Sequence, residues 1–385
     1  MEAPIPKTAR IRLHFPVDRS VHIGDLRLAL ITSLWAWSKK GQLVATDDNL
    51  AALEDLGWLQ VEPDELVPVK DRTPAQEVVD QLFGKRQAYF CYCTPAELRE
   101  MPAAPRGSRE PTLYDGRCRS LSAEDQKALA KAGRKPSVRL RVADNPGQAL
   151  TKRLQAHLPK QTHDFVIMES DGASTTEFAA VFNDNDTQAT HTLLHDRDML
   201  HIHQRILIAN ALKMTSPEFV SIADVEQLGE QTWKTINGLR DAGFHPVAVR
   251  SALLSAGFKG ATQEDIRSQA KSFKLNSLSK GIAQIDLNAM QDKNSSVLQD
   301  MDNNDQVDAI FEHLARRGFA FEDRDKRWRK KFVDLVVDDL NTLADAEAMA
   351  GLVLTSSVNY DKPSAEQLRD DKTQALIDLF EGYIK

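Results

Sequence analysis

The start of the chain places a short apolar segment, a turn and a helix directly after one another, and this order constrains the fold more than any other feature. The segment RIRLHF (10–15) predicts a short buried strand, and DLRLALITSLWAWSKKG (25–41) has the apolar spacing of an amphipathic helix closed by Gly41. QLVAT (42–46) predicts a second strand, followed by acidic residues at the strand end where open α/β sheets bind ligands. The order predicts the opening of a parallel α/β unit.

The pattern changes twice further along the chain. Between about residues 91 and 145 it breaks into turns around a helix, SAEDQKALAKAG, which predicts an insertion packed beside the sheet. DFVIM (164–168) is expected to resume the core as a strand, and HQRILIANAL (203–212) to continue it as a helix. From about Pro246 the apolar spacing is helical, which predicts an all-helical last third with KNSSVLQDMDNND (293–305) as a polar loop.

Length and charge bound the function classes. A chain of 385 residues that is 42% hydrophobic can bury a sizeable core, in roughly two or three domains. The net charge of -7 gives no general attraction for nucleic acid, so no DNA partner is expected, and RNA binding would need a local basic patch. One such run contains Arg324, Lys326, Arg327, Arg329, Lys330 and Lys331, although a run of this kind is more often a solvated helix face.

No part of the sequence predicts a membrane or export function. No apolar run approaches the roughly 20 residues of a membrane span, and the first residues, MEAPIPKTAR, lack the apolar core of a signal peptide. A cytoplasmic protein without a membrane partner is therefore expected. The oligomeric state is left open.

Three cysteines indicate a metal clip. An odd count, with Cys91 and Cys93 one residue apart, argues against a disulfide framework and for metal binding in a reducing compartment. Cys118 follows Tyr114 by four residues, and two close pairs are how short loops deliver the four ligands of a tetrahedral zinc. The alternative is that Cys91 and Cys93 only face the same side of a core strand, with Cys118 incidental.

Four segments, in order, resemble a known family. They are AYFCYCTPAEL (88–98), SDGASTTEFAAVFND (170–184), LRDAGFHPVAVRSALLSAGF (239–258) and FKLNSLSKGIAQIDLNAM (273–290). From about Ala9 to its end, the chain resembles a glutamyl-tRNA synthetase, a class I aminoacyl-tRNA synthetase. Its cysteines and tyrosine are similar to the zinc clip of the family's shortened paralogue, the glutamyl-queuosine tRNA-aspartate synthetase. The resemblance implies zinc bound by Cys91, Cys93, Tyr114 and Cys118.

The resemblance implies an α/β fold with a Rossmann-type catalytic domain. Its two halves would cover residues 9–90 and 146–240, with the zinc-clip insertion at 91–145 between them. An all-helical domain of the type that contacts tRNA would follow at 241–385. The chain ends where the family's anticodon-binding helical cage would begin, so the cage is expected to be absent. ATP and tRNA are the implied ligands.

The phosphate-binding signatures depart from the family. HIGD stands in the place of the class I signature HIGH, so His22 and Gly24 remain as catalytic candidates while Asp25 replaces a hydrogen-bond donor. An ionised carboxylate repels triphosphate but caps a helix well, and losing one donor typically costs about 10²–10³ in rate. A shorter segment, DVEQLGEQTWKTING, replaces the lysine-rich KMSKS-like loop, with Lys234 as its single basic residue and candidate substitute.

The amino-acid pocket implied by the resemblance is also altered. Arg12 falls on the arginine that grips the substrate side-chain carboxylate, and Asp47 or Asp48 on the acidic group that holds its amine. Thr176, Ala180 and Leu194 replace the family's aromatic residue, amide and second arginine. Without that second arginine the pocket loses its bidentate grip on a carboxylate. Efficient glutamylation is therefore not expected.

Three interpretations stay open at this point. The chain is a working tRNA-charging enzyme of unusual chemistry, a truncated and motif-degenerate paralogue that binds tRNA or protein without catalysis, or a protein whose pocket accepts a different small acid or nucleotide. Four histidines, His191, His195, His201 and His203, also raise the alternative of a second metal. The resemblance spreads them over a strand, a loop and a helix start, which favours scattered positions.

Overall fold

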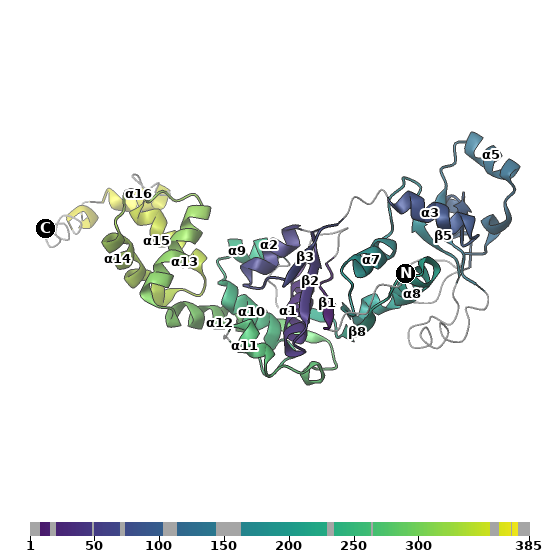
Figure 1. Cartoon of the computed structure of the whole chain (residues 1–385). Helices are drawn as coiled ribbons and strands as arrows, with labels where there is room; N and C mark the ends of the chain where they lie inside the picture. Colours follow the sequence, from purple (N-terminus) through teal and green to yellow (C-terminus); the bar gives the residue numbers. More distant parts are fainter. Residues whose placement is uncertain are drawn as a thin grey trace. The chain divides into compact units, whose positions relative to one another are not determined.

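The computed structural model describes residues 8–15, 21–47, 50–69, 74–102, 114–143, 163–228, 235–262, 265–354, 362–370 and 372–375. They belong to two compact units, one of Met1–Leu239 and Pro246–Lys293, the other of Arg240–His245 and Asn294–Lys385 (Figure 1). The helical domain was expected to begin at residue 241, but residues 246–293 belong to the first unit. Their helices α10 (Pro246–Ser255) and α11 (Ile266–Ala270) pack against α1 (Ile23–Ser38) of that unit. Among the described residues, no helix is long and apolar enough to cross a membrane.

A five-stranded parallel sheet forms the centre of the first unit. Its order is β3 (Glu65–Val67), β2 (Gln42–Thr46), β1 (Arg10–Arg12), β7 (His191–His195) and β8 (Glu218–Ile222). Ile11 of β1 lies opposite Leu43 of β2 on one side and His191 of β7 on the other. The predicted α/β class is confirmed, although the first strand ends at Arg12. Strands distant in the sequence thus meet at β1.

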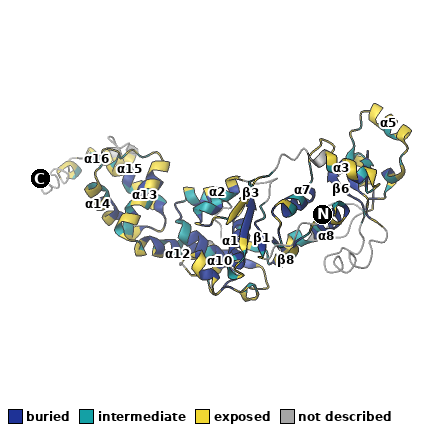
Figure 2. Ribbon diagram, viewed as in Figure 1, coloured by how far each residue is buried: buried dark blue, intermediate teal, exposed yellow. Residues whose placement is uncertain are grey.

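Helix α1 is buried on nearly all sides. All its residues from Ile23 to Ala36 except Gly24 are buried, since strands β1, β2 and β7 cover it as well as α10 and α11 (Figure 2). The expectation of an amphipathic helix is wrong in this respect, because a helix covered on opposite faces is apolar all round. Gly41 follows the helix end as expected, but Lys40 has the positive φ of 53°. Gly41 is needed because an added Cβ would lie 2.6 Å from the Ala9 carbonyl oxygen.

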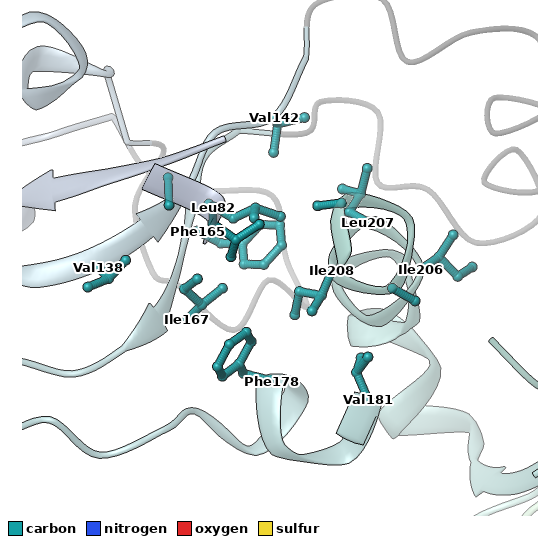
Figure 3. Close-up of a cluster of buried hydrophobic side chains, with 14 of the residues drawn as sticks. Leu82, Val138, Val142, Phe165, Ile167, Phe178, Val181, Ile206, Leu207 and Ile208 are labelled. Atoms are coloured by element: carbon teal, nitrogen blue, oxygen red, sulfur yellow. The ribbon is translucent and has the colours of Figure 1, made fainter. Parts of the chain in front are cut away.

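A second, antiparallel sheet carries the insertion. It contains β4 (Ala88–Cys91), β5 (Ser137–Leu140) and β6 (Phe165–Met168), in that order. The segment DFVIM was expected to resume the main core, but β6 pairs with β5 and not with the parallel sheet. Phe165 and Ile167 of β6 point towards Phe178 of α7 (Thr176–Asp186) and Ile208 of α8 (Ile202–Leu212) (Figure 3). This apolar cluster joins the antiparallel sheet to the helices after it.

Short elements complete the first unit. They are α2 (Leu50–Trp58), α3 (Pro74–Gly84), α4 (Pro95–Arg99), η2 (Arg117–Ser120), α5 (Ala123–Lys131), η3 (Asp196–His201), η4 (Leu275–Ser277), and the parallel pair β9 (Val225–Leu228) and β10 (Ala283–Asp286). Helices α9 (Ile236–Asp241) and α12 (Leu287–Asp300) contain two of the three boundaries between the units, and the third lies directly before α10.

The second unit is helical, as expected for the last part of the chain. Its further elements are α13 (Asn303–Arg316), α14 (Lys326–Val336), η5 (Val337–Asp339), η6 (Leu343–Asp345), α15 (Ala346–Val353) and α16 (Lys362–Leu368). The polar loop expected at 293–305 is wrong, because α12 continues to Asp300. Val297 and Leu298 are buried there, and the buried side chain of Asn294 accepts from His245 N–H and donates to the Asn341 carbonyl. The buried apolar side chains and the two hydrogen bonds of Asn294 therefore stabilise this polar segment as part of a helix.

Gly243 generates a stability prediction for the second unit. Its φ is +77°, and an added Cβ would lie 2.3 Å from the Ala344 nitrogen and 2.8 Å from that of Leu343. Gly318 has a similar φ of +86° but no atom within 4 Å of an added Cβ. We expect Gly318→Ala to lower the free energy of unfolding by about 1 kcal/mol and Gly243→Ala by more than ~3 kcal/mol, measured by denaturant unfolding. Equal losses would show that the close contact is not what requires glycine.

Candidate active site and metal clip

Arg12 lies at the carboxyl end of β1, where its guanidinium forms an ion pair with Asp184. The side chain is 2% exposed, and its Nε lies 2.6 Å from Oδ1 of Asp184 on α7, whose exposure is also 2%. Thr192 of β7 donates to the same oxygen at 3.2 Å. Nη1 donates to the Leu13 carbonyl, while Nη2 is buried and has no hydrogen-bond partner among the described residues. One nitrogen of this guanidinium is therefore left for a ligand.

A small hollow adjoins Arg12. The side chains that line it include Arg12, His14, Thr46, Thr176, Ala180 and Asn183. Its volume is about 20 Å³, which suits a water molecule, so a free amino acid would require it to open. The structure thus brings together three of the residues assigned to the amino-acid pocket, namely Arg12, Thr176 and Ala180.

Two further residues assigned to the pocket, Leu194 and Asp47, do not line the hollow. Leu194 on β7 is 0% exposed and packs in the apolar cluster with Phe178 and Ile206, so it does not line the hollow. The carboxylate of Asp47 accepts the Val69 N–H at 2.6 Å and does not line the hollow either. Asp48 and Lys234 lie outside the described residues.

The first turn of α1 uses Asp25 as a cap. Its carboxylate accepts the backbone N–H of His22 at 2.9 Å, and the residue is only 4% exposed. His22 is the exposed N-cap residue, and the nearest atom to an added Cβ on Gly24 is 3.9 Å away on Val225, so packing does not require glycine there. Nη2 of Arg197 lies 3.8 Å from the Asp25 carboxylate. The helix N-terminus therefore carries an acid with a cation beside it.

His195 is a buried group whose surroundings the sequence did not reveal. It ends β7 at 1% exposure, and its Nδ1 lies 3.6 Å from Oδ1 of Asp224 without a hydrogen bond. Burial lowers the pKa of His195, and the nearby Arg197 lowers it further, which favours the neutral ring. Among the described residues, Cys91, Cys93 and Cys118 form the single group able to hold a metal, so the four histidines do not gather into a second one.

Cys91 lies on β4, Cys93 in the loop after it and Cys118 on η2, and Tyr114 lies just before η2. The sulfur atoms lie within 4.8 Å of one another, with 3.6 Å between Cys93 and Cys118, and Cys91 Sγ is 3.7 Å from Tyr114 Oη. Tetrahedral zinc with Zn–S bonds near 2.3 Å places two sulfurs roughly 3.8 Å apart. The donor set and its spacing therefore fit a zinc ion.

The electrostatics of the clip favour a thiolate. Hydrogen bonds from Cys118 and Cys93 lower the pKa of Cys91 far below its usual range, and the same thiol contacts raise the pKa of Cys93. The buried guanidinium of Arg139 lies 4.0 Å from the Tyr114 ring centroid and adds positive charge. Burial raises the pKa of Tyr114, whose oxygen accepts the Cys118 N–H at 2.9 Å. Cys91 is therefore the member of the cluster whose lowered pKa best suits it to bind a dication.

A buried carboxylate ties the clip to the antiparallel sheet. Asp164, next to β6, accepts from the Tyr89 hydroxyl, from two nitrogens of Arg119 and from the Val142 N–H. These hydrogen bonds from Arg119 and Tyr89 lower the pKa of Asp164 in spite of its burial. One acid thus connects three chain segments around the cysteines.

Comparisons with known proteins agree with this arrangement. The model of the family described as class I tRNA synthetases (E and Q), catalytic domain, matches residues 18–292, and the chain belongs to this family. It is 27% identical to glutamate–tRNA ligase 1 of Caldanaerobacter subterraneus subsp. tengcongensis over 366 residues, 88% of this chain and 76% of that protein. It is also 27% identical to glutamate–tRNA ligase 2 of Thermoanaerobacter pseudethanolicus over 387 residues, 93% and 80% of the two chains. Within the class, the chain is a glutamyl-tRNA synthetase-family protein, as the resemblance implied.

Solved structures show the same fold at low identity. A glutamate–tRNA ligase from Elizabethkingia meningosepticum, in complex with its amino acid, superposes with a TM-score of 0.64 at 16% identity, covering 97% of this chain and 85% of that one. The glutamate–tRNA synthetase of Elizabethkingia anophelis gives a TM-score of 0.66 at 16% identity, covering 94% and 84%. The predicted class I synthetase fold is confirmed.

The clip generates a metal-binding prediction. We expect about one zinc per chain in the purified protein and its loss in Cys118→Ser, measured by elemental analysis and by release to a chromogenic chelator. Tyr114→Phe keeps the ring beside Arg139 but removes the oxygen, so zinc affinity falls by at least roughly tenfold. Tyr92→Phe, at a buried tyrosine between the cysteines, is the matched control and keeps the affinity. Unchanged zinc in Cys118→Ser would contradict a metal clip.

Proposed function

We propose that ATP-dependent attachment of glutamate to tRNA is the ancestral reaction of this chain and is inefficient in it. One observation carries the proposal: Arg12 is the single lysine or arginine among the residues lining the hollow, and its Nε is bound to Asp184. A glutamate side-chain carboxylate would find only Nη2 available, without the second arginine that Leu194 replaces. Hydrogen bonds to charged groups contribute about 1.5–3 kcal/mol each, so affinity falls strongly when one is lost.

The phosphate end of the proposed site points the same way. Activation requires attack of the amino-acid carboxylate on the α-phosphorus of ATP, with pyrophosphate leaving. His22, exposed beside Gly24, is the proposed donor to the phosphates, and Lys234 is the proposed replacement for the missing loop lysines. Asp25 contributes a negative charge one turn away, which opposes the charge that develops in this step. Arg197 offsets that charge in part, at 3.8 Å.

The test is exchange of pyrophosphate into ATP by the folded, zinc-loaded chain. We expect exchange with glutamate to lie far below the turnover of about 10 s⁻¹ typical of enzymes, with or without total tRNA. Asp25→Asn keeps an oxygen that accepts the His22 N–H but removes the charge, so exchange rises severalfold if this charge limits it. Asp198→Asn, which removes another of the acids near Arg197, is the control. Rapid glutamate-dependent exchange in the unchanged protein would refute the proposal, and exchange with another acid would identify a remodelled pocket.

A second candidate function, tRNA binding without catalysis, is favoured by one face of α14. Arg324 and Arg329 of the basic run lie over aromatic rings, 5.1 Å from Trp328 and 4.8 Å from Phe321. The other four are exposed and form no ion pair with a described residue: Lys326, Arg327, Lys330 and Lys331. Their spacing of four residues places them in neighbouring rows of one helix face, suited to phosphate groups.

This candidate has its own measurement. We expect Lys330→Glu combined with Lys331→Glu to weaken binding of total tRNA roughly uniformly across sequences and to reduce the slope of log affinity against log salt by about 1 per lysine. The control carries the same charge change at Lys39 and Lys85, two exposed residues of the first unit. Equal loss in both proteins would assign the effect to net charge and not to this helix face.

A further inference from the structure

Arg139 lies on the face of the antiparallel sheet that carries the metal clip. Its neighbours on β5, Val138 and Leu140, pack in the apolar cluster on the other face (Figure 3), because side chains alternate along a strand. Arg139 lies opposite Tyr89 of β4, two residues before Cys91, so these three side chains share one face of the sheet. Arg139 is only 2% exposed. A positive charge is therefore buried beside the thiols of the clip.

The guanidinium of Arg139 contacts a side chain of the clip directly. Its central carbon lies 4.0 Å from the centroid of the Tyr114 ring, a distance at which the face of the ring attracts a cation. Its Nη1 donates to the Asp164 carbonyl at 3.0 Å, which fixes the direction of the side chain. The oxygen of Tyr114 lies in turn 3.7 Å from Sγ of Cys91. One aromatic ring thus connects the buried cation with the thiols.

A zinc-loaded clip needs positive charge from the protein. Coordinating thiols are deprotonated, and three thiolates carry one negative charge more than a dication neutralises. Cys91, Tyr114 and Cys118 are each at most 6% exposed, so water does little to stabilise this excess charge, and a buried net charge is costly. Three other arginines around the clip already balance acidic side chains, namely Arg117 with Asp115, Arg119 with Asp164 and Arg134 with Glu97.

We propose that Arg139 balances the excess negative charge of the zinc-loaded clip and thereby raises the affinity of the clip for zinc. Arg139 is not a ligand of the metal. It acts on the ligands from behind the ring of Tyr114, as a residue that supports them. Removing such a supporting residue typically costs about 10–100-fold in metal affinity. The inference rests on the metal clip and does not depend on the proposed function.

A purely structural role for Arg139 is the competing explanation. Its bond to the Asp164 carbonyl connects β5 with the residue before β6, so the guanidinium also stabilises the sheet. Loss of that bond alone would lower the free energy of unfolding equally with and without zinc. Loss of a residue that balances the clip would lower it mainly with zinc, because the stabilisation by a bound ion depends on its affinity.

The test measures the zinc affinity of the full chain by competition with a chromogenic chelator. Arg139→Met keeps an unbranched side chain but removes its charge, and we expect it to lower the affinity by roughly tenfold or more. Arg139→Lys keeps the charge and retains most of the affinity. Arg141→Met is the matched control, because this arginine is exposed, follows β5 directly and lies 5.5 Å from the centroid of the Tyr89 ring. It leaves the zinc affinity unchanged.

Denaturant unfolding with and without zinc completes the test. We expect Arg139→Met to lower the free energy of unfolding more in the zinc-loaded chain than in the zinc-free chain. Equal losses in the two forms would assign Arg139 a structural role and overturn the proposal. Equal zinc affinity in Arg139→Met and Arg141→Met would also overturn it, as would an affinity in Arg139→Lys as low as in Arg139→Met. Absence of zinc binding by the unchanged chain would refute the clip and this inference together.

Discussion

The buried ion pair between Arg12 and Asp184 is the interaction on which the candidate active site depends. Both side chains are 2% exposed, so neither charge has water to replace its partner. Removing one partner of a buried pair typically costs 3–5 kcal/mol because the other charge is left uncompensated. The pair holds the carboxyl end of the central strand against α7, and Thr192 of β7 fixes the same carboxylate. Because Asp184 engages Nε of Arg12, Nη2 is the nitrogen of this guanidinium that can still bind a ligand in the hollow.

Three buried arginines of the first unit differ in whether an acidic side chain balances their charge. Arg205 lies against Glu177, and Arg12 against Asp184, so most of each charge is already balanced within the protein. Arg27 has carbonyl partners only, and burial lowers its pKa to about 10, still well above neutral pH. A guanidinium that stays charged without an acid retains its attraction for an anion.

Local sequence predicted the elements whose stability is local, and failed where distant segments decide. The strand–helix–strand opening followed from spacing within short segments. Spacing left the grouping of Cys91, Cys93 and Cys118 open, and the resemblance to the family implied it. The burial of α1 on opposite faces could not be seen, because α10 and α11 follow it by about two hundred residues. The helix at 293–300 depends on Asn294, whose partners His245 and Asn341 are remote in sequence. For the same reason, spacing alone could not tell that Leu194 packs in a core and that Asp184 engages Arg12.

The carboxylate of Asp25 caps helix α1 and places a negative charge at the helix N-terminus. Its bond to the His22 N–H satisfies a donor that the helix leaves unpaired, and a negative charge at a helix N-terminus is favourable. The same N-terminus is where a phosphate would otherwise gain from the dipole and the free N–H groups. The protein group and the ligand therefore compete for one site, and a covalently attached carboxylate is always present. Arg197, about half exposed, lies 3.8 Å from Asp25, and it also lies 3.8 Å from Asp198 and 3.7 Å from Asp224. A triphosphate at the N-terminus of α1 would have to compete with these acids for the charge of Arg197.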